Sequence, residues 1–136
     1  MTAHRSLLPP GWPRPRGYAN GIAARGLMVF TGGLVGWDSA ERFAGGGLAG
    51  QFRQILHNLL AILSEAGAGP EHLVRMTWYV VDVAAYRSQL PVLGAAYREL
   101  IGRNYPAMAV IQVAGLVEPE ALIEIEATAV VPEHGC

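Results

Sequence analysis

The 136-residue sequence contains no lysine and a single cysteine, and only 15% of its residues are charged. With no lysine and a net charge of −1, it lacks the basic clusters with which nucleic-acid-binding proteins contact phosphates. It also cannot carry a GxxxxGK[ST] phosphate loop, because that motif requires a lysine. The one cysteine, Cys136, cannot form an internal disulfide, which fits a reducing compartment, and we interpret it as a tail residue. These absences argue against a nucleic-acid-binding protein and against a disulfide-stabilised one.

Long hydrophobic runs are also missing. No segment approaches the roughly 18 consecutive apolar residues that would span a bilayer. The N-terminal residues have no apolar signal core, because prolines at positions 9, 10, 13 and 15 interrupt them. His57, beside a helical apolar stripe, has no HxxxH or HxxE partner, so we interpret it as a solvated or core-edge residue. We therefore expect a cytoplasmic protein with no membrane partner, no metal and no cofactor.

What is present is ample material for one hydrophobic core. Hydrophobic residues make up 51% of the chain, and its length is typical of a single domain. We divide it into a proline-rich lead at 1–16, one domain at 17–131 and a tail at 132–136. The lead either trails in solvent or lies across the body, anchored by Trp12. The low charged fraction is below the ~25% of an average domain, which favours an oligomer that hides part of its surface.

Periodicity and turn residues predict a β-β-α-β-α-β-β order, with a short extra strand possible after Gly33. The two helices are identified by apolar stripes at i, i+3, i+4 and i+7, and Pro91 is expected to kink or split the second. The expected strands cover 18–24, 27–31, 73–81, 108–114 and 122–131, and the expected helices cover 48–66 and 83–101. We expect the first two strands to be antiparallel around a turn at Arg25-Gly26, and the nearly continuous apolar run at 73–81 to be covered on both faces. Gly67 is expected to end the first helix. This order predicts a two-layer α+β domain with two helices on one face of a mixed sheet. The other face would be bare in a monomer, so we expect it to be a partner surface.

The last predicted strand carries two glutamates on one face. Ile123 and Ile125 alternate with Glu124 and Glu126, which is the period-2 pattern of a half-buried strand. The glutamate face is therefore either solvent-exposed or part of a site. A charged residue on a sheet face is usually just exposed, so the pattern alone does not distinguish the two glutamates.

Several short motifs together resemble those of a known family. They are Gly17-Tyr18, Thr31-Gly32-Gly33, the YPA sequence at 105–107 and IEIEATAV at 123–130. Over residues 17–131 the chain resembles the reactive-intermediate deaminase family (RidA/YjgF, also called endoribonuclease L-PSP). The resemblance implies a chorismate-mutase-like α+β fold, a homotrimer with small-molecule clefts between subunits, and hydrolysis of enamines and imines to keto acids and ammonia.

The resemblance also implies roles for three residues. Glu124 matches the glutamate that positions the attacking water, Gly33 matches a backbone N–H donor, and Tyr18 matches the tyrosine of the site. A carboxylate can take a proton from water beside a C=N carbon if burial raises its pKa. A backbone N–H can stabilise charge that develops during the addition.

Four positions depart from the family pattern. Met108 stands where the family has an arginine that binds the substrate carboxylate, and Gly32 replaces a hydroxyl-bearing residue. Val110 and Gly94 stand in place of a cysteine and an asparagine. An arginine binds a carboxylate through charge-assisted hydrogen bonds worth about 1.5–3 kcal/mol each, whereas methionine offers only a soft apolar surface. We therefore predict an apolar pocket lined by Met108, Val110 and Trp37.

Two hypotheses of function remain open. One is a divergent enamine or imine deaminase with weak activity on small carboxylate-bearing imines, in which Arg14 or Arg16 could replace the missing arginine. The other is a non-catalytic module that binds or senses a small metabolite on the same trimeric scaffold. A ribonuclease is disfavoured because the chain has no lysine, no basic patch and no paired histidines.

Overall fold

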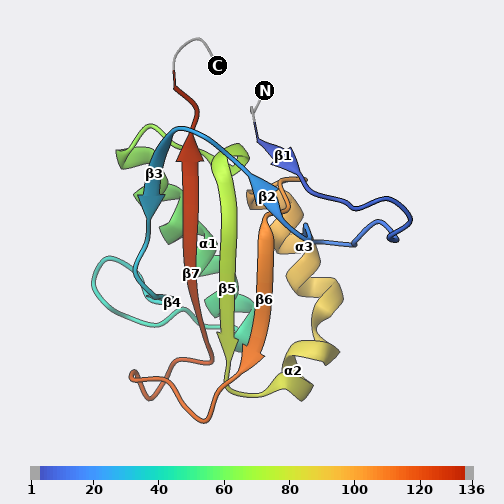
Figure 1. The fold of residues 1–136 in the computed structure, drawn as a ribbon. Helices are drawn as coiled ribbons and strands as arrows, with labels where there is room; N and C mark the ends of the chain where they lie inside the picture. The colour runs from blue at the N-terminus through green and yellow to red at the C-terminus, as the bar shows by residue number, and fades with distance from the viewer. Residues whose placement is uncertain (1–3, 134–136) are drawn as a thin grey trace.

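The computed structural model describes residues 4–133, which form a five-stranded sheet covered by helices on one side and a separate two-stranded sheet (Figure 1). Cys136, interpreted above as a tail residue, lies outside this range. The strands are β1 (Arg5–Ser6), β2 (Ile22–Ala23), β3 (Leu27–Phe30), β4 (Leu34–Val35), β5 (Leu73–Val80), β6 (Ala107–Gln112) and β7 (Ile123–Val131). The helices are α1 (Gly47–Glu65), α2 (Val83–Ser88) and α3 (Leu90–Leu100), with a short 3₁₀ turn at Pro70–His72.

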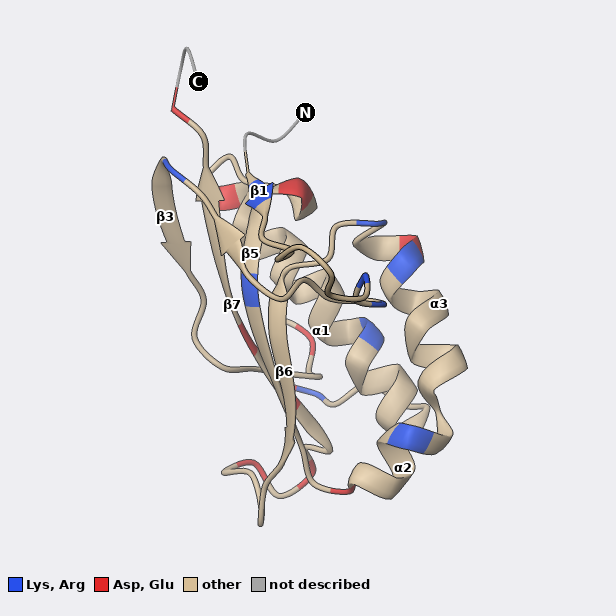
Figure 2. Cartoon of the chain, turned by 45° about the vertical axis from the view of Figure 1, so that its right-hand side comes forward, with Lys and Arg blue, Asp and Glu red and all other residues tan. Residues whose placement is uncertain are grey.

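The main sheet has the order β3-β7-β5-β6, and β4 also pairs with β7. Strand β5 lies at its centre, antiparallel to β7 and parallel to β6. The helices lie on a single face of this sheet, as the turned view in Figure 2 shows. The predicted α+β class is therefore confirmed, including the short strand after Gly33, which is β4.

Helix α1 supplies most of the core. Five of the six residues in its predicted apolar stripe are completely buried, namely Phe52, Ile55, Leu56, Leu59 and Leu63, and the sixth, Leu60, is partly buried. The helix begins and ends within one residue of the predicted bounds, and its end is followed by Gly67 at φ 68°. A glycine reaches this left-handed conformation without a steric penalty, so it ends the helix where the sequence predicts.

The second predicted helix is divided, as Pro91 indicates. Asp82 caps α2 by accepting hydrogen bonds from the N–H groups of Ala84 and Ala85, at 3.0 and 3.1 Å. Gln89 separates α2 from α3, and Pro91 occupies the first turn of α3. In the first turn a missing N–H leaves no hydrogen bond unmade, which explains why a new helix begins there.

The pairing expected at the N-terminus is wrong. Strands 18–24 and 27–31 were expected to pair with each other around Arg25-Gly26. Instead β2 pairs with β1 from the N-terminal lead, and β3 pairs with β7. The lead folds back over the body, and the N–H of Leu7 donates to the carbonyl of Gly21 at 2.9 Å. Trp12 does not anchor it, because its side chain is 58% exposed.

The face opposite the helices is open in the single chain and carries several exposed apolar side chains. Met28 and Phe30 on β3 are 58% and 66% exposed, and Ile111 on β6 is 45% exposed. The apolar run at 73–81 was interpreted as a strand covered on both faces, which is wrong for the single chain. Its residues alternate between buried, as at Trp78, and open, as at Arg75.

Among the helices of residues 4–133, none combines the length and the apolar character that a membrane span requires.

Candidate functional site

Glu124 projects from β7 onto the open face of the sheet and is half-buried. It lies opposite Tyr79 of β5 in the sheet register. The loop before β4 passes so close to it that a Cβ atom on Gly33 would lie 2.9 Å from Cδ of Glu124. With any residue other than glycine at position 33, the carboxylate would have to move. The structure therefore brings together Glu124 and Gly33, two residues that the resemblance assigns to one site.

Thr31 holds this loop in place. Its hydroxyl accepts a hydrogen bond from the N–H of Ala127 on β7 at 3.0 Å and donates to the carbonyl of Gly32 at 2.8 Å. The Gly32-Gly33 segment is thus tied directly to the strand that carries Glu124. A Cβ atom on Gly32 would point into space that no described residue occupies. As a glycine, Gly32 can contribute only backbone atoms to a site.

The two glutamates of β7 have different surroundings. The hydroxyl of Tyr79 donates to Oε1 of Glu126 at 2.6 Å. This hydrogen bond is the main cause of a raised pKa at Tyr79, because ionising the phenol would place two negative charges together. Within residues 4–133, no group donates a hydrogen bond to the Glu124 carboxylate. Glu126 is engaged with Tyr79, and Glu124 is available to a water or a ligand.

Met108 and Val110 do not join Glu124 within one chain. In the parallel pairing of β5 and β6, Met108 is opposite the fully buried Met76, and both Met108 and Val110 pack against the core. Directly paired residues share a face of the sheet, so these two side chains point toward the helices. Glu124 points to the other face. The sheet itself separates the predicted apolar pocket from the predicted catalytic carboxylate.

Met108 lines a pocket of about 190 Å³ between β6 and the α2–α3 layer. Its walls are largely aromatic and apolar, and two arginines lie at its edge. The aromatic lining residues are Trp78, Tyr86, Tyr97 and Tyr105, and the arginines are Arg16 and Arg98. The rings of Tyr97 and Tyr105 are stacked with centroids 5.6 Å apart, and burial raises the pKa of Tyr97. Among residues 4–133, no acidic side chain lines this pocket.

Arg98 was missed by the sequence analysis. The sequence feature that could have indicated Arg98 is its spacing of four residues from Gly94, because residues four apart lie on the same side of a helix. A Cβ on Gly94 would lie 3.2 Å from Nη1 of Arg98, so the guanidinium extends along this side of α3. The glycine at position 94 thus leaves space that the Arg98 guanidinium approaches.

Tyr18 lies in a second, adjoining groove. Its side chain is 44% exposed and lines a space of about 610 Å³ together with Arg14, Arg16 and Arg103. This groove shares Arg16, Gly17 and Tyr105 with the Met108 pocket. Of the two arginines proposed from the sequence as substitutes, Arg16 therefore borders Met108, and Arg14 borders only the groove.

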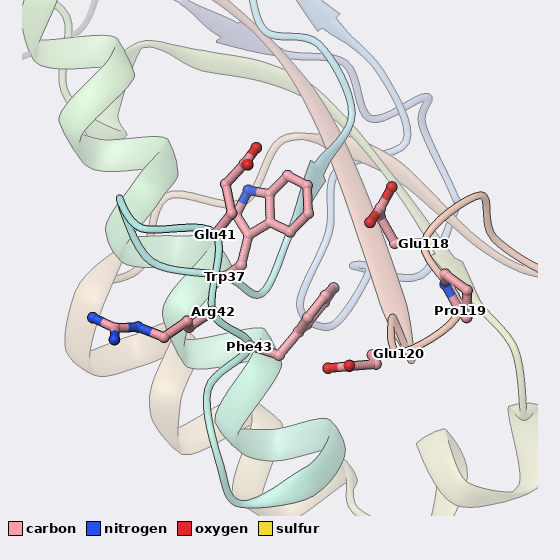
Figure 3. Close-up of a pocket in the computed structure, with 7 residues that line it drawn as sticks. All are labelled: Trp37, Glu41, Arg42, Phe43, Glu118, Pro119 and Glu120. Carbon is pink, nitrogen blue, oxygen red and sulfur yellow. The ribbon is translucent and has the colours of Figure 1, made fainter.

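Trp37 lies in a different pocket of about 480 Å³ (Figure 3). Asp38 forms a turn in which its Oδ1 accepts hydrogen bonds from the N–H groups of Ala40 and Arg42. The turn brings the chain back on itself, so that the ring centroids of Trp37 and Phe43 lie 5.5 Å apart. These hydrogen bonds lower the pKa of Asp38. The remaining lining is mainly acidic, so the structure does not place Trp37 beside Met108 within one chain.

Comparisons with known proteins identify the family. The family model described as "Endoribonuclease L-PSP" matches residues 13–131. The chain is 32% identical over 124 residues to "3-aminoacrylate deaminase RutC" of Acinetobacter baylyi, covering 90% of this chain and 94% of that protein. It is 31% identical over 103 residues to human "2-iminobutanoate/2-iminopropanoate deaminase", covering 75% and 72%.

A solved structure is also similar to this fold. The Rid-family protein YyfB of Yersinia pestis, described as of unknown function, superposes with a TM-score of 0.80 at 34% identity. The match covers 94% of this chain and 98% of that protein.

Proposed function

Because the chain belongs to the RidA/YjgF family, also described as endoribonuclease L-PSP, we propose that it is a divergent imine or enamine deaminase that acts in clefts between subunits of a homotrimer. The observation that carries this proposal is the Glu124 carboxylate. It is half-buried, lies against the Gly33 backbone and has no hydrogen-bond donor within residues 4–133. Two relatives named as deaminases of imino or amino acids support the reaction class.

The chemistry follows from what a carboxylate can do beside a C=N bond. Glu124 accepts a proton from a water whose oxygen adds to the C=N carbon, and the protonated Glu124 returns that proton to the nitrogen. As the C–N bond of the resulting carbinolamine breaks, the hydroxyl proton passes through Glu124 to the nitrogen, giving a C=O group and ammonia and leaving Glu124 ionised. The N–H of Gly33 can donate to charge that develops on the adduct. Water and the imine thus account for every atom of the keto product and ammonia.

The trimer is proposed because one chain cannot complete the site. Met108 and Glu124 lie on opposite faces of one sheet, so a cleft that contains both needs a second copy. The open sheet face carries exposed Met28 and Phe30, an apolar surface that a neighbouring subunit would cover.

We expect light scattering at micromolar concentration to give three times the chain mass of 14.5 kDa. Phe30→Glu is expected to shift the mass toward the monomer, because it places a charge on the face that packs against a neighbour. Val117→Glu, on a side chain that is 92% exposed, is the control and should leave the mass unchanged. A monomer at all concentrations tested would contradict the proposal.

The missing arginine defines the second prediction. Wild-type protein is expected to release ammonia from small imines of the 2-aminoacrylate type little faster than buffer, because Met108 cannot donate to their carboxylate. Met108→Arg should raise that rate, since each charge-assisted hydrogen bond to a carboxylate contributes about 1.5–3 kcal/mol. The assay is ammonia release from enzymatically generated imine.

The double variant Met108→Arg, Glu124→Gln is the control and should return to the buffer rate. A gain that survives Glu124→Gln would show that the reaction takes place elsewhere. No turnover of any imine by wild type or Met108→Arg would instead favour the second candidate, a non-catalytic module that binds a small metabolite. The apolar and aromatic pocket at Met108 is the observation in favour of that alternative.

A further inference from the structure

We propose that Arg16 and Arg98 form an anion-binding site at the edge of the Met108 pocket, and that this protein takes an organic acid whose body is aromatic. The inference deepens the proposed function by naming the substrate class, and it rests on it for the location of the cleft. It concerns two arginines that the RidA/YjgF motifs do not include.

The charge around this pocket is positive and uncompensated. Four of the ten arginines line the Met108 pocket and the adjoining groove, namely Arg14, Arg16, Arg98 and Arg103. In the part of the chain that the structure describes, no aspartate or glutamate lines either space. In a chain of net charge −1, this is a local concentration of positive charge that would attract an anion. Figure 2 shows basic positions of the N-terminal segment near those of the α3 end.

Arg16 and Arg98 have no acidic partner among the described residues, as is also true of Arg5, Arg25, Arg75 and Arg87. By contrast, Arg53 forms an ion pair with Glu99, and Arg42 lies 3.9 Å from Asp38. The side chains of Arg16 and Arg98 form no ion pair and no hydrogen bond with any residue in the range 4–133. Their guanidinium groups are therefore free to bind a carboxylate, which a guanidinium can hold through two parallel hydrogen bonds.

Two departures from the family pattern fit together here. Met108 removes an arginine from β6, and Gly94 removes a side chain from the neighbouring surface of α3. The Nη1 atom of Arg98 lies where even a Cβ on residue 94 would be only 3.2 Å away. An asparagine at position 94 would crowd the guanidinium. The glycine therefore lets an arginine from the helix present its charge near the position that Met108 leaves uncharged.

The side chains that line the pocket indicate which group the bound acid carries besides its carboxylate. Trp78, Tyr97 and Tyr105 present ring surfaces, and Met108 adds a polarizable thioether that packs well against aromatic rings. The volume of about 190 Å³ is sufficient for one ring, since an apolar cavity of about 150 Å³ accommodates benzene. The ring would enter the pocket, and the carboxylate would remain at the edge with Arg16 and Arg98.

Binding of 3-phenylpropionate measured by titration calorimetry tests the site, with 3-phenylpropanamide as the uncharged isostere and propionate as the acid without a ring. We expect the aromatic acid to bind at least about tenfold more tightly than the amide and than propionate, because hydrogen bonds to charged groups and ring burial each contribute at least that factor. Arg98→Gln and Arg16→Gln should each remove about tenfold of the acid's affinity and leave the amide's unchanged. Arg42→Gln, the same charge change in the Trp37 pocket, should have no effect.

Gly94→Asn is a second test that keeps both arginines. It should weaken binding of the acid, because the asparagine side chain crowds Arg98, and should leave the affinity for the amide unchanged. Equal binding of acid and amide, or no binding of the acid at millimolar concentration, would overturn the proposal, as would equal losses in Arg98→Gln and Arg42→Gln. Circular dichroism of each variant confirms that the fold is retained.

The outcome is separable from that of the proposed function, because binding needs no turnover. If the acid binds as expected and no imine is hydrolysed, the anion site stands and the deaminase proposal fails. If imines are hydrolysed through Glu124 while acid and amide bind equally, the deaminase proposal stands and the anion site fails.

Discussion

Glu124→Gln is expected to slow hydrolysis of the imine that wild-type protein turns over fastest by roughly 10²–10⁴-fold, the usual contribution of a positioned general base. Glutamine keeps the size of the side chain but cannot accept the proton of the attacking water. The carboxylate has no hydrogen-bond donor within residues 4–133, so the change breaks no contact that the structure shows. Ammonia release reports the rate, and an unchanged unfolding midpoint confirms that the fold is intact.

A pair of glycine variants tests the same site through the backbone. Gly33→Ala places a methyl group where its carbon would lie 2.9 Å from Cδ of Glu124, so the carboxylate must move. The rate should fall even though Glu124 is retained, since misplacing a catalytic group by about 1 Å can cost 10²-fold. Gly32→Ala is the matched control, because nothing lies within 4 Å of a Cβ at that position.

Three results would contradict this assignment. They are turnover by Glu124→Gln at the wild-type rate, equal losses in Gly32→Ala and Gly33→Ala, and a loss in Glu126→Gln as large as that in Glu124→Gln. The last would show that the hydrogen bond between Tyr79 and Glu126 belongs to the reaction, although in the structure it occupies that carboxylate.

The elements that the sequence predicts well are those whose signal is local. The stripe from Phe52 to Leu63 determines α1, and the alternation at Ile123 and Ile125 determines β7, because burial on one face repeats with the period of the element. Pro91 and Gly67 mark helix boundaries through their own backbone constraints. Each of these follows from a few neighbouring residues.

Pairing partners were harder to predict because they depend on distant segments. The strand at 27–31 has an adjacent candidate at 18–24, yet β7 is its partner and the N-terminal lead pairs with β2. Nothing local to Arg25-Gly26 distinguishes a tight hairpin from a crossover between two sheets. Trp37 was assigned to the Met108 pocket for the same reason, since the Asp38 turn that directs it toward Phe43 is visible only in the fold.

The candidate site could be predicted only in part. Glu124 and Gly33 are adjacent, as the motifs imply, whereas Met108 and Glu124 occupy opposite faces of the sheet. The sequence does not single out Arg98 as a site residue, because an arginine on an amphipathic helix usually belongs to the solvated face. Its relevance comes from its approach to Gly94 and from its position in the lining of the Met108 pocket, which are properties of the packed structure.

Phe52→Ala is expected to lower the free energy of unfolding by about 3–5 kcal/mol, the usual effect of removing a buried aromatic ring and leaving a cavity. Phe52 is fully buried in the first half of α1, and its ring centroid lies 4.8 Å from that of Trp78 on β5. Ile62→Ala, on a side chain of the same helix that is 38% exposed, is the control and should cost much less. Urea denaturation of both variants at one protein concentration gives the comparison, because the stability of an oligomer depends on concentration.

The same substitution connects the core to the proposed anion site. Trp78 contacts Phe52 on one side and lines the Met108 pocket with the rings of Tyr86 and Tyr97 on the other. Without Phe52 the indole loses a packing partner and can shift, so binding of 3-phenylpropionate should weaken even under conditions in which the variant is fully folded. Arg98→Gln should show the opposite combination, with weaker binding and unchanged stability. If Phe52→Ala lowered stability by less than Ile62→Ala does, the assignment of this helix face to the core would be wrong.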